Sequence, residues 1–163
     1  MRKGFTMIEL IFVIVILGVL ASVAIPRLAA TRDDAEVAKA ATNLTTAVSD
    51  ITAYYTAKGK FESNAQSDFS KITNALSKDG KLKVKGDKEC VTVQLPASAI
   101  GNGAATTTDT EVKLTLKFVP SADPVCKQLS KLPGILTMCG KDSNSNVSGD
   151  CSIQIGGSGG IQF

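Results

Sequence analysis

The sequence contains no histidine and no tryptophan, and aromatic residues make up only 5% of its 163 residues. The absence of histidine excludes Ser-His-Asp and Cys-His catalysis and any metal site built on imidazole ligands. The formal net charge is only +3, and Arg2 and Lys3 supply two of these charges, so the composition does not require a nucleic-acid partner. We therefore expect a chain that is not an enzyme and that needs no organic cofactor.

An apolar segment dominates the amino-terminal end. Residues Leu10 to Ile25 are uncharged, and twelve of these sixteen residues are Leu, Ile, Val or Phe. Such a segment favours membrane insertion by roughly 4–7 kcal/mol, whereas Glu9 opposes it by about 2.5–3.5 kcal/mol. As a helix the segment spans about 24 Å, or about 31 Å when Phe5 to Glu9 are included. The sequence therefore predicts a single membrane span, with the basic leader on the cytoplasmic side.

Three other interpretations account for the apolar residues. A plain signal anchor explains them together with the basic leader, and a cleaved secretory signal could use Ser22-Val23-Ala24 as its small-residue site. The third is the buried core helix of a soluble protein, but the segment is apolar all round, which argues against it. Neither the anchor nor the secretory signal explains why Glu9 precedes the apolar residues.

Glu9 is a carboxylate at the start of a membrane segment, and such a group normally has a functional partner. If the chain were cut after Gly4, the new amine on Phe5 would lie one helical turn from Glu9. In a bundle of helices, Glu9 of one copy could then pair with the Phe5 amine of the next copy. This arrangement predicts self-assembly through the amino-terminal helices.

The residues Gly4-Phe5-Thr6-Met7-Ile8-Glu9-Leu10 and the apolar run to Pro26 resemble the class III signal of type IV pilins and type II secretion pseudopilins. The resemblance implies that a prepilin peptidase cleaves after Gly4 and N-methylates Phe5, with S-adenosylmethionine as the methyl donor to the peptidase. It also implies that Glu9 is the assembly carboxylate. Gly18 and Pro26 fall at helix-breaking positions of the family, where the helix can melt in a filament. One departure is conservative, since Met7 stands where leucine is commoner.

The resemblance further implies a function, partners and a location. The chain would be a subunit of a type IV pilus or of a type II secretion pseudopilus, in a homo-oligomeric or mixed filament. Its partners would be membrane lipid before assembly, the prepilin peptidase, an assembly ATPase with its inner-membrane platform, and an outer-membrane secretin. It would cross the inner membrane once, with its globular domain in the periplasm, or at the cell surface in a pilus. The alternatives are a membrane-anchored binding domain that never polymerises and a competence pseudopilin for DNA uptake.

Three segments follow: residues 1–4 as a cleaved leader, 5–26 as the hydrophobic membrane and assembly helix, and 27–163 as the globular domain. Apolar residues spaced by four and three predict that the helix continues from Phe5 to Tyr55 and stops at Gly59. They are Val37, Ala41, Leu44, Val48, Ile51 and Tyr55. The connection from Lys60 to Lys78 is predicted to contain one short helix, whose shared face would be Phe69, Ile72, Ala75 and Leu76.

From Lys81 onward apolar residues alternate with polar ones, which predicts strands with one buried face. The candidate strands are Leu82–Val84, Val91–Leu95, Val112–Phe118, Ile135–Cys139 and Cys151–Ile155. Their buried face needs a cover, and the apolar stripe of the long helix supplies one. The sequence therefore predicts an α+β fold, in which the helix packs on a small antiparallel sheet. This agrees with the pilin-like roll that the resemblance implies.

Four cysteines in the second half of the chain suggest disulfides formed in an oxidising compartment. Cys139 and Cys151 flank an eleven-residue loop between two candidate strands, and facing positions at the base of a hairpin suit a disulfide. We favour this pair, which leaves Cys90 with Cys126, although four cysteines allow three pairings. Pairing of Cys126 with Cys139 would instead give a C-terminal disulfide loop like that of the family.

The loop between Cys139 and Cys151 is rich in oxygen ligands. Calcium prefers such ligands, and the candidates are Asp142, Asn144, Asn146 and Asp150. Major pseudopilins carry a calcium site in a comparable loop, but its ligands cannot be aligned with these residues one by one. The loop does not fit an EF-hand, because Val147 stands at the glycine position and Ile153 at the glutamate position. The alternative is a solvated turn that uses Asx and Gly chemistry.

Five lysines cluster between residues 78 and 88, interleaved with acidic residues: Lys78, Lys81, Lys83, Lys85 and Lys88. Lysines on the outside of an edge strand resist pairing with another chain, and we favour this interpretation. A DNA-binding patch is the alternative, but no aromatic residue interleaves with the lysines to stack on bases.

The processing hypothesis predicts the mass of the mature amino-terminal peptide. We expect mass spectrometry of the protein from its native membrane to find a chain that begins at N-methylated Phe5. An intact Met1, or a chain that begins at Ile25, would contradict the processing hypothesis.

Overall fold

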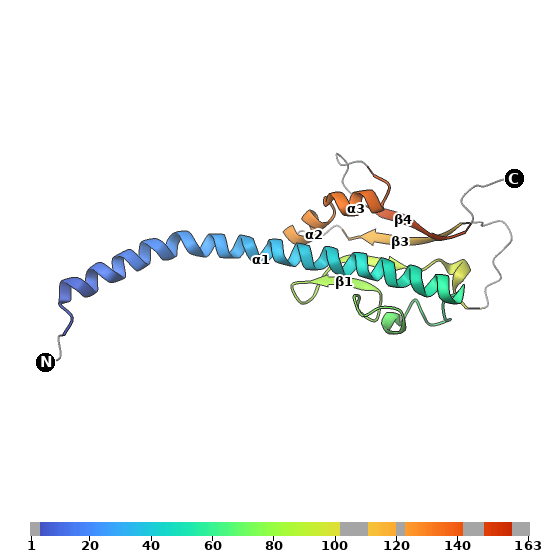
Figure 1. The fold of residues 1–163 in the computed structure, drawn as a ribbon, viewed down its shortest axis with the longest axis horizontal. Coiled ribbons are helices and arrows are strands. Elements are labelled where there is room, and N and C mark those ends of the chain that lie inside the picture. Colours follow the sequence, from blue (N-terminus) through green and yellow to red (C-terminus); the bar gives the residue numbers. More distant parts are fainter. Residues whose placement is uncertain (1–3, 102–110, 120–122, 142–148, 158–163) are drawn as a thin grey trace. The chain divides into compact units, whose positions relative to one another are not determined.

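The computed structural model describes residues 4–101, 111–119, 123–141 and 149–157. It confirms the predicted α+β class, with one long helix and a four-stranded antiparallel sheet in the pilin-like arrangement (Figure 1). The chain divides into two compact units, Met1–Ala35 and Glu36–Phe163. The elements are α1 (Met7–Lys58), β1 (Lys81–Val84), β2 (Lys88–Gln94), β3 (Val112–Phe118), α2 (Pro124–Leu129), α3 (Pro133–Met138) and β4 (Asp150–Gly156).

The second half of α1 buries a stripe of small and branched apolar side chains. The buried members are Val37, Ala40, Leu44, Ala47 and Ile51. The prediction was right for Val37, Leu44 and Ile51. The other predicted residues, Ala41, Val48 and Tyr55, lie at the margin of the stripe and are only partly buried. The helix ends as predicted, because Gly59 takes a positive φ of 69° and its N–H donates to the Tyr55 carbonyl at 2.7 Å.

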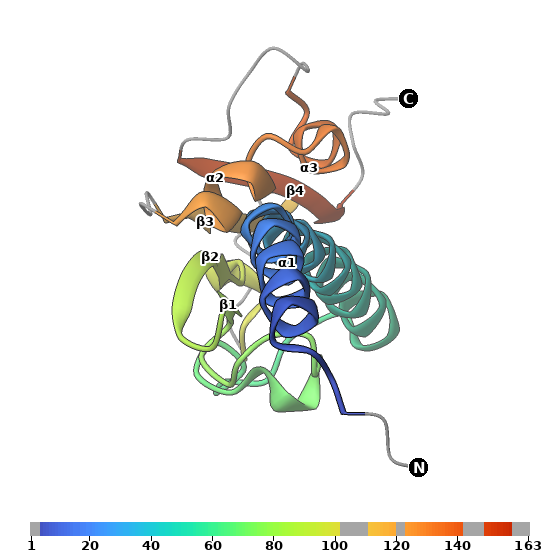
Figure 2. The ribbon, with the colours of Figure 1, turned by 90° about the vertical axis from the view of Figure 1, so that its left-hand side faces the viewer.

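The four strands lie in the order β1-β2-β3-β4, and every neighbouring pair is antiparallel. One face of the sheet is buried and contributes Leu82, Val91, Val93, Leu114 and Leu116 to the same core cluster as α1. The opposite face is polar, and its Thr92, Lys113, Thr115 and Lys117 are exposed or half-buried. Figure 2, which looks along α1, shows α3 beside β4 at the far edge of the sheet from β1. The predicted one-sided sheet is therefore confirmed.

A β-bulge interrupts the pairing of β1 with β2. Leu82 pairs with Val91 and Lys83 pairs with Glu89, so Cys90 has no partner residue in β1. Both Cys90 and Val91 are buried, although strict alternation would place one of them on the polar face. The bulge therefore turns Cys90 towards the protein interior.

The prediction of a strand at Ile135–Cys139 was wrong, because these residues lie in α3 and at its C-terminal cap. Pro133 occupies the first turn of this helix, where its fixed φ favours helix and its missing N–H costs nothing. The sequence analysis also missed α2. Asp123 caps α2 by accepting the Val125 N–H at 2.9 Å, and Pro124 follows it, so an Asp-Pro signal for a helix start was present.

The connection after α1 forms less helix than predicted. Only Phe69–Lys71 is helical, as a single 3₁₀ turn capped by Asp68. Thr73 opposes further helix, because its hydroxyl accepts the Ala75 N–H at 3.1 Å and donates to Asp50 of α1 at 2.7 Å. Such side-chain bonds to nearby backbone groups compete with helical bonds.

The buried stripe of α1 leads to a stability prediction. Leu44 is completely buried, so Leu44→Ala leaves a cavity and should lower the free energy of unfolding by about 2–5 kcal/mol. Thr45→Ala is the matched control, since Thr45 is exposed and bonds only to carbonyls of its own helix. We expect this control to change stability by less than about 0.5 kcal/mol in urea unfolding of the full chain in detergent micelles. Equal effects of the two substitutions would contradict the assigned packing.

Candidate functional site

The residues at the predicted cleavage site lie just before α1. Gly4 and Phe5 are outside the helix, which begins at Met7, and the Phe5 side chain is 84% exposed. A hypothetical Cβ on Gly4 meets no atom within 4 Å. The Gly4–Phe5 peptide bond therefore lies in exposed, non-helical backbone of the kind that a peptidase can bind in an extended form.

Thr6 and Glu9 form a local hydrogen-bond pair at the start of α1. The Thr6 hydroxyl accepts the Glu9 N–H at 3.3 Å and donates to a Glu9 carboxylate oxygen at 3.5 Å. The Leu10 N–H donates to the Thr6 carbonyl at 3.2 Å, which makes Thr6 the N-cap. The sequence analysis missed this role, although Thr-x-x-Glu is the sequence signature of a capping box. Glu9 therefore also stabilises the positive end of its own helix.

The first part of α1 exposes apolar side chains on all sides. Met7–Ile25 is long and apolar enough to cross a membrane, and none of its side chains is buried. The hydroxyl of Ser22 donates to the Val19 carbonyl at 2.7 Å, so this polar group is satisfied within the helix. A helix that is apolar all round is stable only when lipid or other helices cover it.

Gly18 and Pro26 both lie inside α1, which continues through them without a break. A hypothetical Cβ on Gly18 would meet no atom within 4 Å. Glycine and proline are the two least favourable residues inside a helix, at about 1 and 3 kcal/mol relative to alanine. These positions are therefore the weakest points of this part of α1.

Two disulfides link the elements of the globular unit. Cys90 of β2 is bonded to Cys126 of α2, and Cys139 at the end of α3 is bonded to Cys151 of β4, with Cα atoms 5.1 and 5.3 Å apart. This is the pairing that the sequence analysis favoured. Its stated reason was wrong, because Cys139 caps a helix and does not stand at the base of a hairpin.

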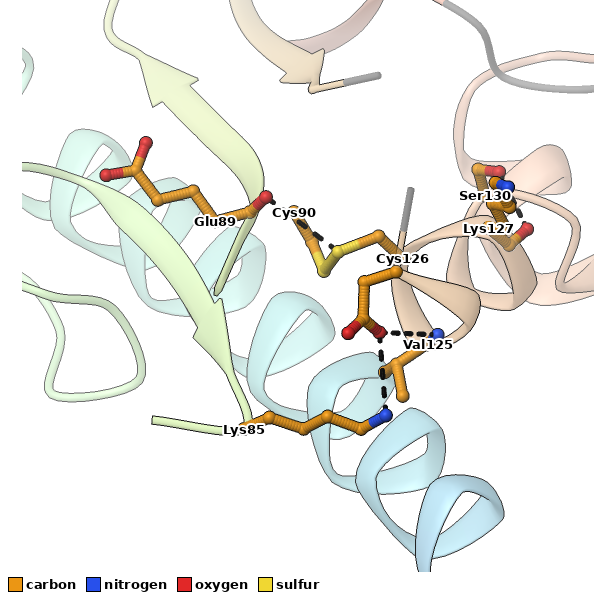
Figure 3. Close-up of a disulfide and its surroundings, with 8 residues drawn as sticks. Lys85, Glu89, Cys90, Val125, Cys126, Lys127 and Ser130 are labelled. Carbon is orange, nitrogen blue, oxygen red and sulfur yellow. Dashed lines mark hydrogen bonds and ion pairs between the residues drawn. A yellow bond between two sulfur atoms is a disulfide. The ribbon is translucent and has the colours of Figure 1, made fainter. Parts of the chain in front are cut away.

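The Cys90–Cys126 disulfide lies beside a second connection between the β1–β2 hairpin and α2. Lys85, in the hairpin turn, places its ammonium group 3.7 Å from the Asp123 carboxylate that caps α2. Figure 3 shows the Lys85 side chain reaching towards the start of α2 near the disulfide. The disulfide and the ion pair therefore both connect the β1–β2 hairpin to α2.

Of the four candidate calcium ligands, Asp142, Asn144 and Asn146 lie outside the described residues. Asp150 begins β4, and its carboxylate is 4.0 Å from the ammonium group of Lys117.

The cluster of lysines falls on and beside β1, which is an edge strand as expected. Three of the five are paired with acids: Lys81 with Glu89 at 2.8 Å, Lys83 with Asp87 at 3.7 Å, and Lys85 with Asp123. The Glu89 hydrogen bond raises the pKa of Lys81, and the Ser77 hydroxyl lowers the pKa of Asp79. The pairing neutralises much of the positive charge that a DNA-binding patch would need.

Removing the disulfides one at a time should lower stability according to loop length. Cys90→Ala/Cys126→Ala opens a separation of 36 residues, for which chain entropy predicts a loss of about 4 kcal/mol. Cys139→Ala/Cys151→Ala opens a separation of 12 residues, for which we expect about 3 kcal/mol. Urea unfolding measures both losses. Peptide mapping without reduction checks the pairing, and a peptide that links Cys126 to Cys139 would contradict it.

The amino-terminal segment matches a known motif. Residues 1–25 match the family profile described as the prokaryotic N-terminal methylation motif. No curated protein and no solved structure matches the chain. The matched residues include Gly4, Phe5, Glu9 and the apolar part of α1, which are the residues that the geometry groups at the exposed start of the helix. The amino-terminal segment therefore carries the class III signal motif of type IV pilin-like and pseudopilin-like proteins, and this match supports such a protein.

Proposed function

We propose that the chain is a structural subunit that polymerises into a type IV pilus or a type II secretion pseudopilus. The observation that carries the proposal is the match of residues 1–25 to the methylation motif, because these residues also form the exposed apolar start of α1. An all-round apolar helix with one carboxylate in its first turn suits both a membrane before assembly and a bundle of helices afterwards.

Processing would create the group that Glu9 needs. Cleavage between Gly4 and Phe5 removes the basic leader and leaves a new α-amine on Phe5. Methylation keeps the positive charge of an amine while changing its size. The prepilin peptidase would supply both steps, with S-adenosylmethionine as its methyl donor.

Pairing of the Phe5 amine with Glu9 of a neighbour would set the register of assembly. A carboxylate deep in an apolar environment costs about 2.5–3.5 kcal/mol when it is unpaired, so a register that leaves Glu9 alone is disfavoured. Phe5 of one subunit meeting Glu9 of the next is a head-to-tail contact. When the rotation from one subunit to the next does not close a ring, repeated head-to-tail contacts generate an open helical filament.

The weak points of α1 would then act during assembly. Gly18 and Pro26 lie eight residues apart in α1, and each lowers the stability of the helix relative to alanine. We infer that the helix between them unfolds locally when the subunit leaves the lipid and packs among other subunits.

This function places the subunit in the inner membrane, with its globular unit on the periplasmic side. The two disulfides support that side, because disulfides persist in oxidising compartments. An assembly ATPase with its membrane platform would extract the subunit from the membrane. An outer-membrane secretin would accommodate the filament.

One observation favours a second candidate function, an anchored domain that never polymerises. Thr6 already provides a local partner for Glu9, so helix capping by itself could explain why the carboxylate is there. The two candidates differ in whether the negative charge of Glu9, or only its capping ability, is needed.

Glu9→Gln separates the two functions. Glutamine also serves in a capping box but carries no charge, so the start of α1 should be preserved. We expect filament incorporation to fall by about tenfold or more, because the Phe5 amine would be left unpaired in an apolar bundle. Shearing and electron microscopy measure the filaments, and immunoblotting of the membrane fraction measures the subunit that remains.

Asp34→Asn is the matched control. It removes one carboxylate from the same helix, but Asp34 is exposed and lies beyond the candidate span. We expect normal filaments from this variant. Normal filaments from Glu9→Gln would refute the pairing and favour capping as the role of Glu9.

A further inference from the structure

A groove opens at the carboxyl-terminal end of α1, within the globular unit. Its volume is about 550 Å³, which lies within the range of about 300–1,000 Å³ that is usual for small-ligand sites. We call it the Tyr54 groove. It is lined by Tyr54, Lys58, Lys60, Phe61, Glu62, Ser63, Asn64 and Gly101.

The base of the Tyr54 groove is held in place from two sides. Phe61 is buried, and its ring lies parallel to that of Tyr54 with the centroids 5.9 Å apart. The Phe61 N–H donates to the Ala99 carbonyl at 2.7 Å, and the Gly101 N–H donates to the Phe61 carbonyl at 2.8 Å. These bonds tie the segment after α1 to the segment after β2. The groove is therefore built on core residues and paired backbone.

The charge of the groove is mainly positive. Its single carboxylate, Glu62, already pairs with Lys71 at 2.7 Å, and this hydrogen bond holds the pKa of Glu62 below its usual value. The ammonium group of Lys58 lies over the Tyr54 ring, 4.8 Å from its centroid. Lys60 is exposed and makes no ion pair with any residue that the structure describes. Lys58 and Lys60 therefore remain available for an anion.

Three uncharged groups in the groove are ready to form hydrogen bonds. The side chains of Ser63 and Asn64 are exposed, and neither bonds to another side chain or to backbone in the described part of the chain. The Tyr54 side chain is half-buried, and its hydroxyl likewise makes no hydrogen bond within the described part of the chain. A hydroxyl, an amide and a phenol can each both donate and accept, which suits a ligand with many hydroxyl groups.

We propose that the Tyr54 groove binds an acidic sugar, that is, a saccharide that bears a carboxylate. Lys58 and Lys60 contact the carboxylate, and Ser63, Asn64 and the Tyr54 hydroxyl bond to the sugar hydroxyls. Lys58 leaves the Tyr54 ring to do so, and an exposed cation–π contact of this kind is weak. An acidic peptide also carries carboxylates but offers few hydroxyl groups to Ser63, Asn64 and Tyr54, and it is the alternative occupant in the test below. The proposal does not rest on polymerisation.

Isothermal titration of the full mature chain tests the proposal. The protein is held in micelles of a zwitterionic detergent without a sugar headgroup, which would otherwise compete. Digalacturonate is the probe, and galactobiose and tetraglutamate are the neutral-sugar and acidic-peptide comparisons. We expect saturable binding of digalacturonate, about tenfold tighter than either comparison because only this probe offers both carboxylates and hydroxyls. Equal binding of galactobiose or tetraglutamate, or no binding of digalacturonate, would overturn the proposal.

Two variants then locate the site. Lys60→Gln removes one cation, and Tyr54→Phe removes one hydroxyl while keeping the ring that stacks on Phe61. Each should weaken digalacturonate binding by about fivefold or more, without a shift in urea unfolding that would signal misfolding. Lys39→Gln is the matched control, since Lys39 is exposed like Lys60 but lies on α1, about five turns before the end of the helix at Lys58. Wild-type affinity in Lys60→Gln and Tyr54→Phe, or an equal loss in Lys39→Gln, would show that the sugar does not bind in this groove.

Discussion

The covering of apolar surface on α1 is the constraint on which the rest of the structure depends. In its second half, one stripe that includes Leu44 and Ile51 is covered by the sheet of the same chain. In its first half every described side chain is exposed, and most of these side chains are apolar. Apolar surface of this size must be removed from water by lipid or by other subunits. The same helix is therefore a core element of the globular unit and an unsatisfied binding element outside it.

The globular unit compensates for a core with few aromatic residues by cross-linking its elements. Each disulfide joins a strand to a short helix: Cys90 of β2 to Cys126 of α2, and Cys139 after α3 to Cys151 of β4. The two helices are only six residues long, and helices of that length are unstable without tertiary support. The cross-links supply this support and keep α2 and α3 against the core.

Glu9 shows how one side chain can satisfy two physical demands. In the single subunit its carboxylate lies by the Thr6 hydroxyl at the start of α1, where the helix dipole favours negative charge. A carboxylate has several acceptor sites, so this bond leaves room for a second donor. The amine that cleavage would create on Phe5 is such a donor. Capping in the subunit and pairing in a filament are therefore compatible, and capping keeps the carboxylate positioned before a neighbour arrives.

The sequence by itself determined the long helix, four of the five predicted strands, and the segment with Gly4, Phe5 and Glu9 that matches the methylation motif. These features are local, since they follow from spacing, from hydrophobicity and from a contiguous motif. The strand predicted at Ile135–Cys139 failed because a short apolar run fits a helix or a strand equally well, and Pro133 decides between them only once the helix packs. Only the tertiary structure decided that Cys90 turns inwards, because a bulge depends on the register of two strands. It also brought Gly101 to the Tyr54 groove through the Phe61–Ile100 bridge, whereas the other lining residues all lie between Tyr54 and Asn64 in the sequence.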